Sequence, residues 1–191
     1  LFSLDSGLFF ERDLEWGKKD YRQTLDPRIF YLYSPKKNQQ NLPNFDSSEL
    51  TFNYSQLFRD SRFSGGDRIA DYNQVSIGLG SNISSQDSGN ELLSLSLGQA
   101  FFIEDPAIRL LPNQDSPESS PISGSMTMHL SQNWLINSGF TWNSDKNINE
   151  TNSLGVTYLG DTGQLLGLEL YSREIPNNTS NVYDQSQQSK L

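Results

Sequence analysis

Apolar side chains alternate with small or polar ones along most of this chain, and this period of two residues limits the folds open to it. The clearest run has apolar side chains at Val75, Ile77, Leu79 and Ile83, and small or polar residues at Ser76, Gly78, Gly80 and Asn82. Successive side chains of a β-strand point to opposite faces, so this pattern predicts strands with one apolar and one polar face. The best helical candidate, 50–60, is short and interrupted by Ser and Asn. The chain is therefore expected to be all-β.

Eight segments share the alternation, namely 2–11, 24–33, 75–84, 93–103, 125–131, 134–143, 154–158 and 166–170. Most are expected to form strands of about 9–11 residues, the length that a tilted strand needs to cross a bilayer. The face expected to meet lipid carries Val75, Ile77, Leu79, Leu93, Leu95 and Leu97. The face expected to line a water-filled lumen carries Ser76, Gly78, Ser94 and Ser96.

The small supply of apolar residues favours a membrane barrel over a soluble domain. Hydrophobic residues make up 34% of the chain, against about 45–50% in soluble domains. A soluble protein needs a core enclosed from both sides, whereas a barrel with lipid outside and water inside needs apolar residues on one face only. The chain contains no run of roughly 18 apolar residues, so it encodes no transmembrane helix.

The connections between the expected strands alternate in length. The longer ones are 34–73, 104–121, 144–150 and 173–191, and the mostly short ones are 13–21, 85–90, 131–133 and 160–164. Outer-membrane barrels have short periplasmic turns and longer extracellular loops, so the first set is expected to be extracellular. A secreted sugar-binding β-sandwich is the main soluble alternative. It has no reason to sort its loops by length, and its strands would be shorter, about 5–6 residues.

Few side chains suit catalysis, and none of the residues forms an evident cofactor or metal site. His129 is the only histidine and there is no cysteine, so neither a catalytic triad nor a standard zinc site is expected. An outer-membrane lipase is disfavoured for the same reason. The net charge of −9 with scattered Lys and Arg argues against a nucleic-acid partner. A diffusion porin stays open, because charges facing each other across a pore cannot be read from one sequence.

Three stretches carry a resemblance to a known family. They are RQTLDPRIFYLYSP at 22–35, FDSSELTFNYSQLFRDSRFSGGDRIADYNQVSIGL at 45–79 and LSLGQAFF at 95–102. The ordered set LFRD, SGGDRIA and DYNQ is far more specific than any alternation. These residues resemble the LPS-assembly protein (LptD) family, in its C-terminal barrel domain. Beyond Phe102 the likeness fades into generic barrel sequence.

The resemblance implies an antiparallel transmembrane β-barrel of about 26 strands that follows a periplasmic jelly-roll domain. Residues 1–191 would be one part of this C-terminal barrel domain, incomplete at both ends. The implied function is the assembly of lipopolysaccharide (LPS) into the outer leaflet of a Gram-negative outer membrane, by non-enzymatic transport through the lumen and a lateral gate. The implied partners are LPS, an LptE-type lipoprotein that plugs the barrel and, through the missing N-terminal domain, the periplasmic Lpt bridge proteins.

The connection 34–73 is expected to be more than a turn, because its many apolar side chains must be buried against something. In the resembled family, the equivalent loop folds into the barrel and contacts the plug lipoprotein. The residues carried over as partner-binding are Asp46, Ser47, Leu50, Phe52, Tyr54, Leu57, Phe58, Arg59 and Asp60. The alternative is a lid that packs against neighbouring loops and closes the extracellular mouth.

The same loop is rich in charges of both signs, at Arg59, Asp60, Arg62, Asp67, Arg68 and Asp71. These side chains could recognise phosphate and sugar groups of LPS, or they could form internal salt bridges that hold the shape of the loop. Because the two signs are equal in number, internal salt bridges are the favoured interpretation.

Overall fold

One antiparallel sheet accounts for nearly all of the secondary structure. The computed structural model describes residues 1–39, 41–108 and 117–174. Its strands are β1 (Phe2–Gly7), β2 (Phe10–Trp16), β3 (Lys19–Ser34), β4 (Tyr72–Ser85), β5 (Glu91–Phe102), β6 (Ile122–His129), β7 (Trp134–Asn143), β8 (Ile148–Leu159) and β9 (Leu165–Arg173). The one helix among these residues is the short 3₁₀ helix η1 (Tyr54–Phe58). The all-β, antiparallel expectation is confirmed.

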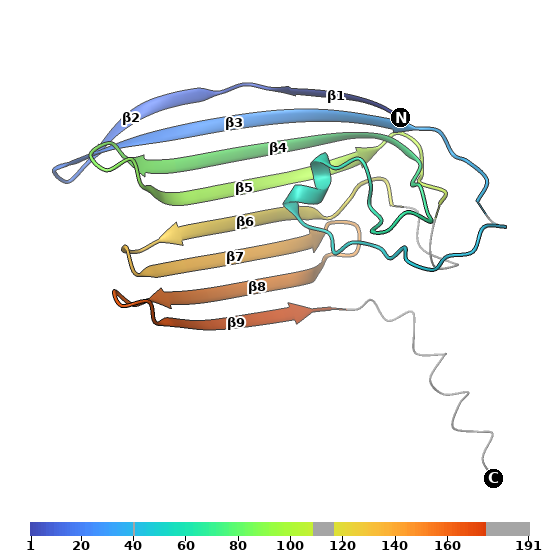
Figure 1. Cartoon of the computed structure of the whole chain (residues 1–191). Coiled ribbons are helices and arrows are strands. Elements are labelled where there is room, and N and C mark those ends of the chain that lie inside the picture. The colour runs from blue at the N-terminus through green and yellow to red at the C-terminus, as the bar shows by residue number, and fades with distance from the viewer. Residues whose placement is uncertain (40, 109–116, 175–191) are drawn as a thin grey trace, which may run out of the picture.

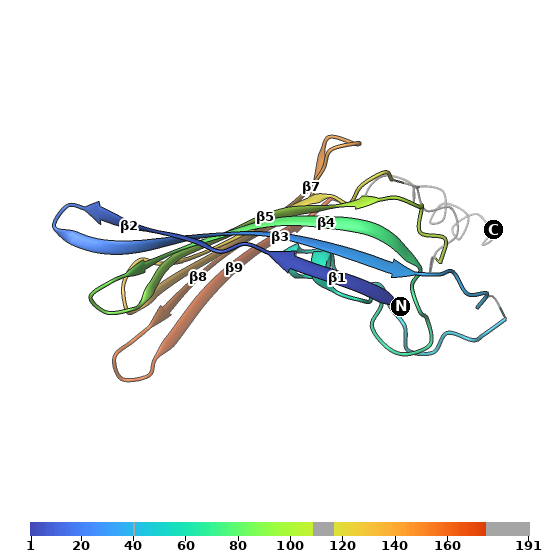
Figure 2. The same ribbon diagram turned by 90° about the horizontal axis from the view of Figure 1, so that it is seen from above.

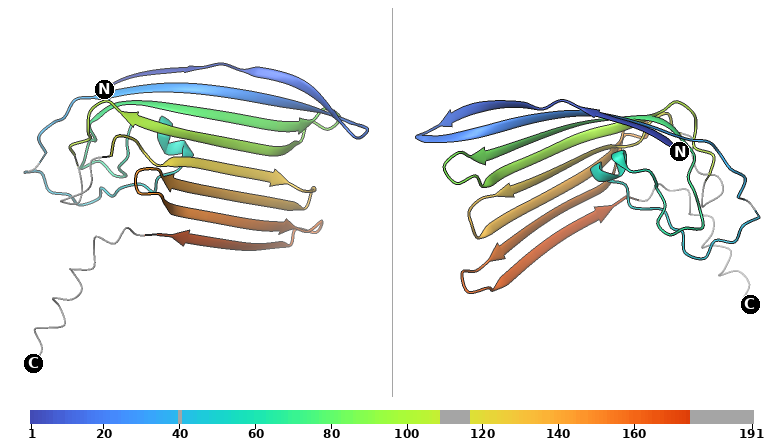
Figure 3. Two further views of the ribbon diagram at one scale, coloured as in Figure 1. Left: turned by 180° about the vertical axis from the view of Figure 1, so that it is seen from behind. Right: turned by 45° about the horizontal axis from the view of Figure 1, so that its top comes forward.

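From β2 to β9 the strands lie in chain order, and each pairs with the next one in sequence (Figure 1). Both β1 and β2 pair with β3, and within the described residues neither they nor β9 has a partner on the outer side. The sheet is therefore open, with β1 and β2 at one edge and β9 at the other (Figure 3). None of the helices in the described part of the chain is long and apolar enough to cross a membrane.

Nine strands appear where eight were expected, because the first expected strand is interrupted at Leu8 and Phe9. The register is the same on both sides of the interruption, with Gly7 opposite Arg28 and Phe10 opposite Leu25. The amide of Leu8 donates to the carbonyl of Pro27 at 3.0 Å. Proline has no N–H with which to return that bond, so the ladder breaks at this pair.

The two faces of the sheet differ as the alternation predicts. Ile77, Leu79, Leu95 and Leu97 are exposed on one face. Their neighbours on the other face form hydrogen bonds between hydroxyl groups of adjacent strands, such as Ser96 Oγ to Ser125 Oγ at 2.6 Å and Thr141 Oγ1 to Thr151 Oγ1 at 2.7 Å. We call these the apolar face and the polar face.

The connections also separate by end (Figure 1). The connections 17–18, 86–90, 130–133 and 160–164 lie at one end, and 35–71, 103–121 and 144–147 lie at the other. Two differ from their expected lengths. The connection expected over 13–21 is a two-residue turn at Gly17 and Lys18. The connection expected over 144–150 is shorter, 144–147, because β8 begins at Ile148. Residues 109–116 and 175–191 of the other two long connections lie outside the described residues.

Much of the loop 35–71 extends beyond the ends of the strands, but its middle part turns back so that η1 lies against the polar face (Figure 2). A small core forms where this loop meets the end of β3 and the start of β4. Its buried members are Phe30, Leu32, Phe63, Ala70 and Tyr72. Some apolar side chains of the loop are thus buried against the same chain, whereas Leu42, Phe45 and Ile69 stay exposed.

Candidate functional site: a loop seated on the polar face

The helix η1 is seated in a gap that two glycines leave on the polar face. Gly78 of β4 and Gly98 of β5 are directly paired in the sheet. A Cβ atom on Gly78 would lie 2.5 Å from Phe58 Cζ, and one on Gly98 would lie 2.7 Å from Leu57 Cδ1. Leu57 keeps only 1% of its surface exposed. We call Gly78 and Gly98 the socket, because any side chain there would occupy the space that η1 fills.

Local sequence explains why η1 forms at this point. Asn53 is its N-cap, and the Asn53 side chain accepts hydrogen bonds from the amides of Ser55 and Gln56. Such a cap satisfies amide groups that have no partner inside the helix. The helix ends at Phe58, and the next residue, Arg59, returns to an extended backbone conformation. The turn therefore brings Tyr54, Leu57 and Phe58 together on the side that meets the sheet.

A charged pair on β1 and β3 supports the aromatic side chains of η1. Arg28 donates from both Nε and Nη2 to the two carboxylate oxygens of Asp5, with Nε to Oδ1 at 2.9 Å. The guanidinium carbon lies 4.2 Å from the centre of the Phe58 ring, in cation–π geometry. Tyr54 packs edge-on against Phe58 at 5.4 Å between ring centres. Burial against the sheet raises the pKa of the Tyr54 hydroxyl above its usual value.

Farther from the sheet, two carboxylates lock the loop into a clasp. Asp67 Oδ2 accepts from the amides of Phe45 and Asp46, at 2.6 and 3.0 Å, and Asp46 Oδ1 accepts from the amides of Gly66 and Asp67. The backbone hydrogen bond from Phe45, followed by that from Asp46, lowers the pKa of the Asp67 carboxyl. The chain turns at Gly65, which has a φ of +73°. This clasp leaves the Phe45 side chain 85% exposed.

A third anchor ties the end of the loop to the next connection. The carboxylate of Asp71 accepts from the amides of Ala107 and Ile108, at 2.7 and 2.9 Å. Arg62 lies 3.6 Å from Asp71, donates to the Ile108 carbonyl and stacks over the Phe63 ring at 4.9 Å. Two loops that are far apart in sequence are thereby held together.

These anchors decide where the expected charged residues lie. Four of the six charged side chains form hydrogen bonds within the loops, mostly to backbone groups: Arg62, Asp67, Arg68 and Asp71. Among the described residues, the only salt bridge between two loop side chains joins Arg62 and Asp71. Arg59 and Asp60 are exposed. Four of the six charged side chains thus hold the shape of the loops, as expected. They do so mostly through hydrogen bonds to the backbone and not through the expected salt bridges.

The nine expected partner-binding residues fall into three groups. Tyr54, Leu57 and Phe58 face the sheet, and Asp46 and Ser47 belong to the clasp. The remaining four are Leu50 and Phe52, which are half-buried, and Arg59 and Asp60, which are exposed. Sequence reasoning did not find the socket or the Asp5–Arg28 pair. Gly78 and Gly98, each next to a serine along the polar face of its strand, were the available signal. They form one socket only because β4 and β5 pair in a register that sets them opposite each other.

No group of three or more His, Asp or Glu side chains in the described part of the chain is placed to hold a metal ion. What the site offers is a surface for non-covalent contact. It consists of the exposed side of the seated loop together with the hydroxyl-rich strip of polar face that the loop leaves uncovered.

Comparison with known proteins gives consistent matches. The family model described as LPS transport system D matches residues 1–189. The LPS-assembly protein LptD of Pseudomonas savastanoi pv. phaseolicola is 54% identical over 110 residues, covering 58% of this chain and 12% of the relative. That of Methylococcus capsulatus is 54% identical over 111 residues, covering 58% and 11%. That of Pseudomonas putida (strain W619) is 39% identical over 184 residues, covering 85% and 20%. The chain thus spans a fifth or less of the length of these relatives.

Proposed function

The chain belongs to the LptD family of LPS transport proteins, and on that premise we propose that it forms part of the wall of an outer-membrane β-barrel that assembles LPS at the cell surface. The proposal assigns no catalysis to the chain. Its role is to provide a lipid-facing surface, a water-facing surface and a loop that narrows the lumen. LPS would move past these surfaces without any covalent change and leave through a lateral gate.

The observation that carries this proposal is the two-sided sheet. Leucine and isoleucine side chains are exposed on the apolar face of the four neighbouring strands β1, β3, β4 and β5. In water, such an apolar surface would promote aggregation. The polar face instead carries serine, threonine and glycine along with the seated loop. A bilayer on one side and a water-filled lumen on the other satisfy both faces. The end that carries 35–71 would then be extracellular, and the end with the short turns periplasmic.

The loop 35–71 would be a fixed part of the lumen, and we extend the proposal to an LptE-type lipoprotein that contacts it. Tyr54, Leu57 and Phe58 already bury their side chains against the sheet, so a partner would meet the other side of the turn. Arg59 and Asp60, which follow η1, are exposed and so are open to such a partner. A lid without a partner remains the competing role for this loop.

A photo-crosslinking pair separates these two roles in cells that make the full-length protein. A benzophenone amino acid at Arg59 should crosslink to the lipoprotein, whereas the same amino acid at Tyr54, whose aromatic ring faces the sheet, should crosslink within the barrel. Crosslinks from Arg59 and Tyr54 only to the barrel would refute the contact and favour the lid.

The transport function itself is tested by depletion of the full-length protein. LPS reaching the surface of intact cells should fall, and sensitivity to large hydrophobic antibiotics should rise. A normal level of surface LPS after depletion would contradict the proposed function.

A further inference from the structure

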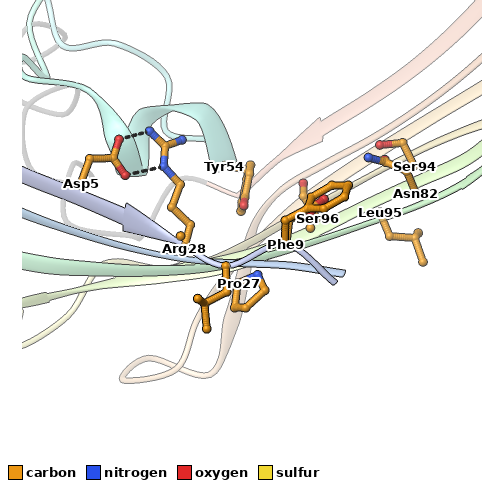
Figure 4. A pocket seen from close by; sticks show the side chains of 13 residues that line it. Asp5, Phe9, Pro27, Arg28, Tyr54, Asn82, Ser94, Leu95 and Ser96 are labelled. Atoms are coloured by element: carbon orange, nitrogen blue, oxygen red, sulfur yellow. Dashed lines mark hydrogen bonds and ion pairs between the residues drawn. The ribbon is translucent and has the colours of Figure 1, made fainter. Parts of the chain in front are cut away.

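An aromatic side chain lies on the polar face at the interruption between β1 and β2. The register on either side of it sets Leu8 opposite Pro27 and Phe9 opposite Asp26. Phe9 is 63% exposed, and its ring lies on the same side of the sheet as Tyr54, whereas Pro27 points to the other side (Figure 4). The Phe9 ring therefore offers an exposed apolar surface beside the polar side chains of Asp26 and Asn82.

A cavity of about 500 Å³ lies beside this ring, between the interrupted edge and η1. Its polar wall is formed by Asp26, Asn82, Ser94 and Ser96, and its aromatic members are Phe9 and Tyr54. This size is within the range of about 300–1,000 Å³ that is usual for small-molecule sites. The cavity opens on the polar face and shares Tyr54 with the seated loop.

The hydrogen-bonding groups of the cavity favour a ligand that donates hydrogen bonds. Asp26 Oδ1 is buried and has no hydrogen-bond partner, while Oδ2 accepts from Thr24 Oγ1 at 3.2 Å. A buried carboxylate oxygen without a donor is costly. The Asp26 side chain lines the cavity, so a turn of this carboxylate toward a ligand hydroxyl would give Oδ1 the donor that it lacks. Arg28 is already paired with Asp5, which leaves Asp26 as the uncompensated charge of the cavity. A phosphate group would be repelled by it.

We propose that this cavity is a saccharide-binding subsite that takes one or two neutral sugar units. The Phe9 ring would pack against the apolar C–H face of a sugar, and Asp26 and Asn82 would bind its hydroxyl groups. This inference rests on the proposed function, because LPS supplies the sugar. It adds that the barrel wall binds the core oligosaccharide of LPS at a defined site during transport.

The test uses the full-length protein, purified in detergent, and the core oligosaccharide released from LPS by mild acid. Calorimetric titration should show saturable binding of the oligosaccharide and none of inorganic phosphate. Phe9→Ala should weaken that binding about tenfold, as expected for loss of one aromatic contact. Phe10→Ala is the matched control, because Phe10 is the next residue and lies on the apolar face, and it should leave binding unchanged.

Asp26→Asn provides a second variant that keeps the size of the side chain. It should weaken binding several-fold, and heat-modifiable mobility on a gel shows whether each variant is still a closed barrel. No binding to the unaltered protein, or equal binding by the Phe9 and Phe10 variants, would overturn the inference. If surface LPS is normal while the oligosaccharide does not bind, the subsite is wrong and the transport function stands. If depletion leaves surface LPS unchanged, the transport function itself is wrong.

Discussion

The socket makes a sharp prediction, because two glycines on the same face of β4 have different surroundings. A Cβ atom at Gly78 would lie 2.5 Å from Phe58 Cζ and 2.7 Å from Tyr54 Oη, both closer than real contacts. A Cβ atom at Gly80 would lie 3.6 Å from Asp26 Cβ, an ordinary contact. Gly78→Leu should therefore displace η1, whereas Gly80→Ala should leave it seated.

The size of the effect follows from what η1 buries. A leucine at Gly78 needs the space of both the Phe58 and Tyr54 rings, so these cannot stay seated. Loss of burial costs about 1.5–3 kcal/mol for Leu57 and less for Phe58, which is only partly buried. Gly78→Ala should have a smaller effect of about 1–3 kcal/mol, typical of overpacking, because the tips of two side chains can shift.

Hydrogen exchange of the loop amides in the full-length protein measures this directly. The amides of Gln56 and Arg59, which are bonded within the turn, should exchange at least tenfold faster in Gly78→Leu, since about 1.4 kcal/mol corresponds to a factor of ten. Strand amides of β7 and β8 should keep their protection. Unchanged exchange at Gln56 in Gly78→Leu, or an equal loss in Gly80→Ala, would refute the seating of η1 in the socket.

Three further predictions follow from the sheet and the clasp. Ile77→Arg should lower the amount of assembled barrel, at a cost of about 2–4 kcal/mol if the residue lies at the bilayer midplane, and normal levels of heat-modifiable protein would contradict its lipid-facing position. Pro27→Val restores an N–H opposite Leu8 and should stabilise the edge by about 0.5–1.5 kcal/mol, seen as slower amide exchange in β1 and β2; faster exchange would argue against proline as the cause of the break. The clasp should loosen in acid, because folding lowers the pKa of the Asp67 carboxyl. The ionised carboxylate stabilises the clasp fully above the ordinary pKa of 3.8, and this stabilisation is lost as the pH falls through the lower pKa of the folded state. Asp67→Asn should remove this pH dependence of loop exchange, and an unchanged acid transition in that variant would assign the transition to another group.

The alternation of side chains was enough to predict the two faces of the sheet, because side-chain direction in a strand depends only on position along the chain. The expected strand length of about 9–11 residues was mostly wrong: β7 and β9 have it, whereas β1 has 6 residues and β3 has 16. The interruption at Leu8 and Phe9 was not predictable from that pattern. Pro27 breaks a ladder only on the side to which its nitrogen points, and that side depends on which strand is the neighbour.

The site was predictable in composition but not in geometry. The apolar content of 34–73 required burial, and the loop does bury Leu57 and Phe63. The surface that receives it was hidden, because Gly78 and Gly98 become one socket only when β4 and β5 pair in this register. The charged residues were expected to pair with one another, but most satisfy backbone groups of an irregular loop, which needs such partners wherever it is buried.

The central claim is that adjacent residues of β5 face water and lipid in turn, and spin labels on the full-length protein in outer-membrane vesicles test it most directly. A nitroxide attached at Ser96→Cys should be relaxed strongly by a water-soluble nickel chelate and weakly by oxygen. One attached at Leu97→Cys, the next residue, should show the reverse, because oxygen partitions into the bilayer. Equal accessibility of the two positions, or the opposite order, would contradict the proposed wall of an outer-membrane barrel.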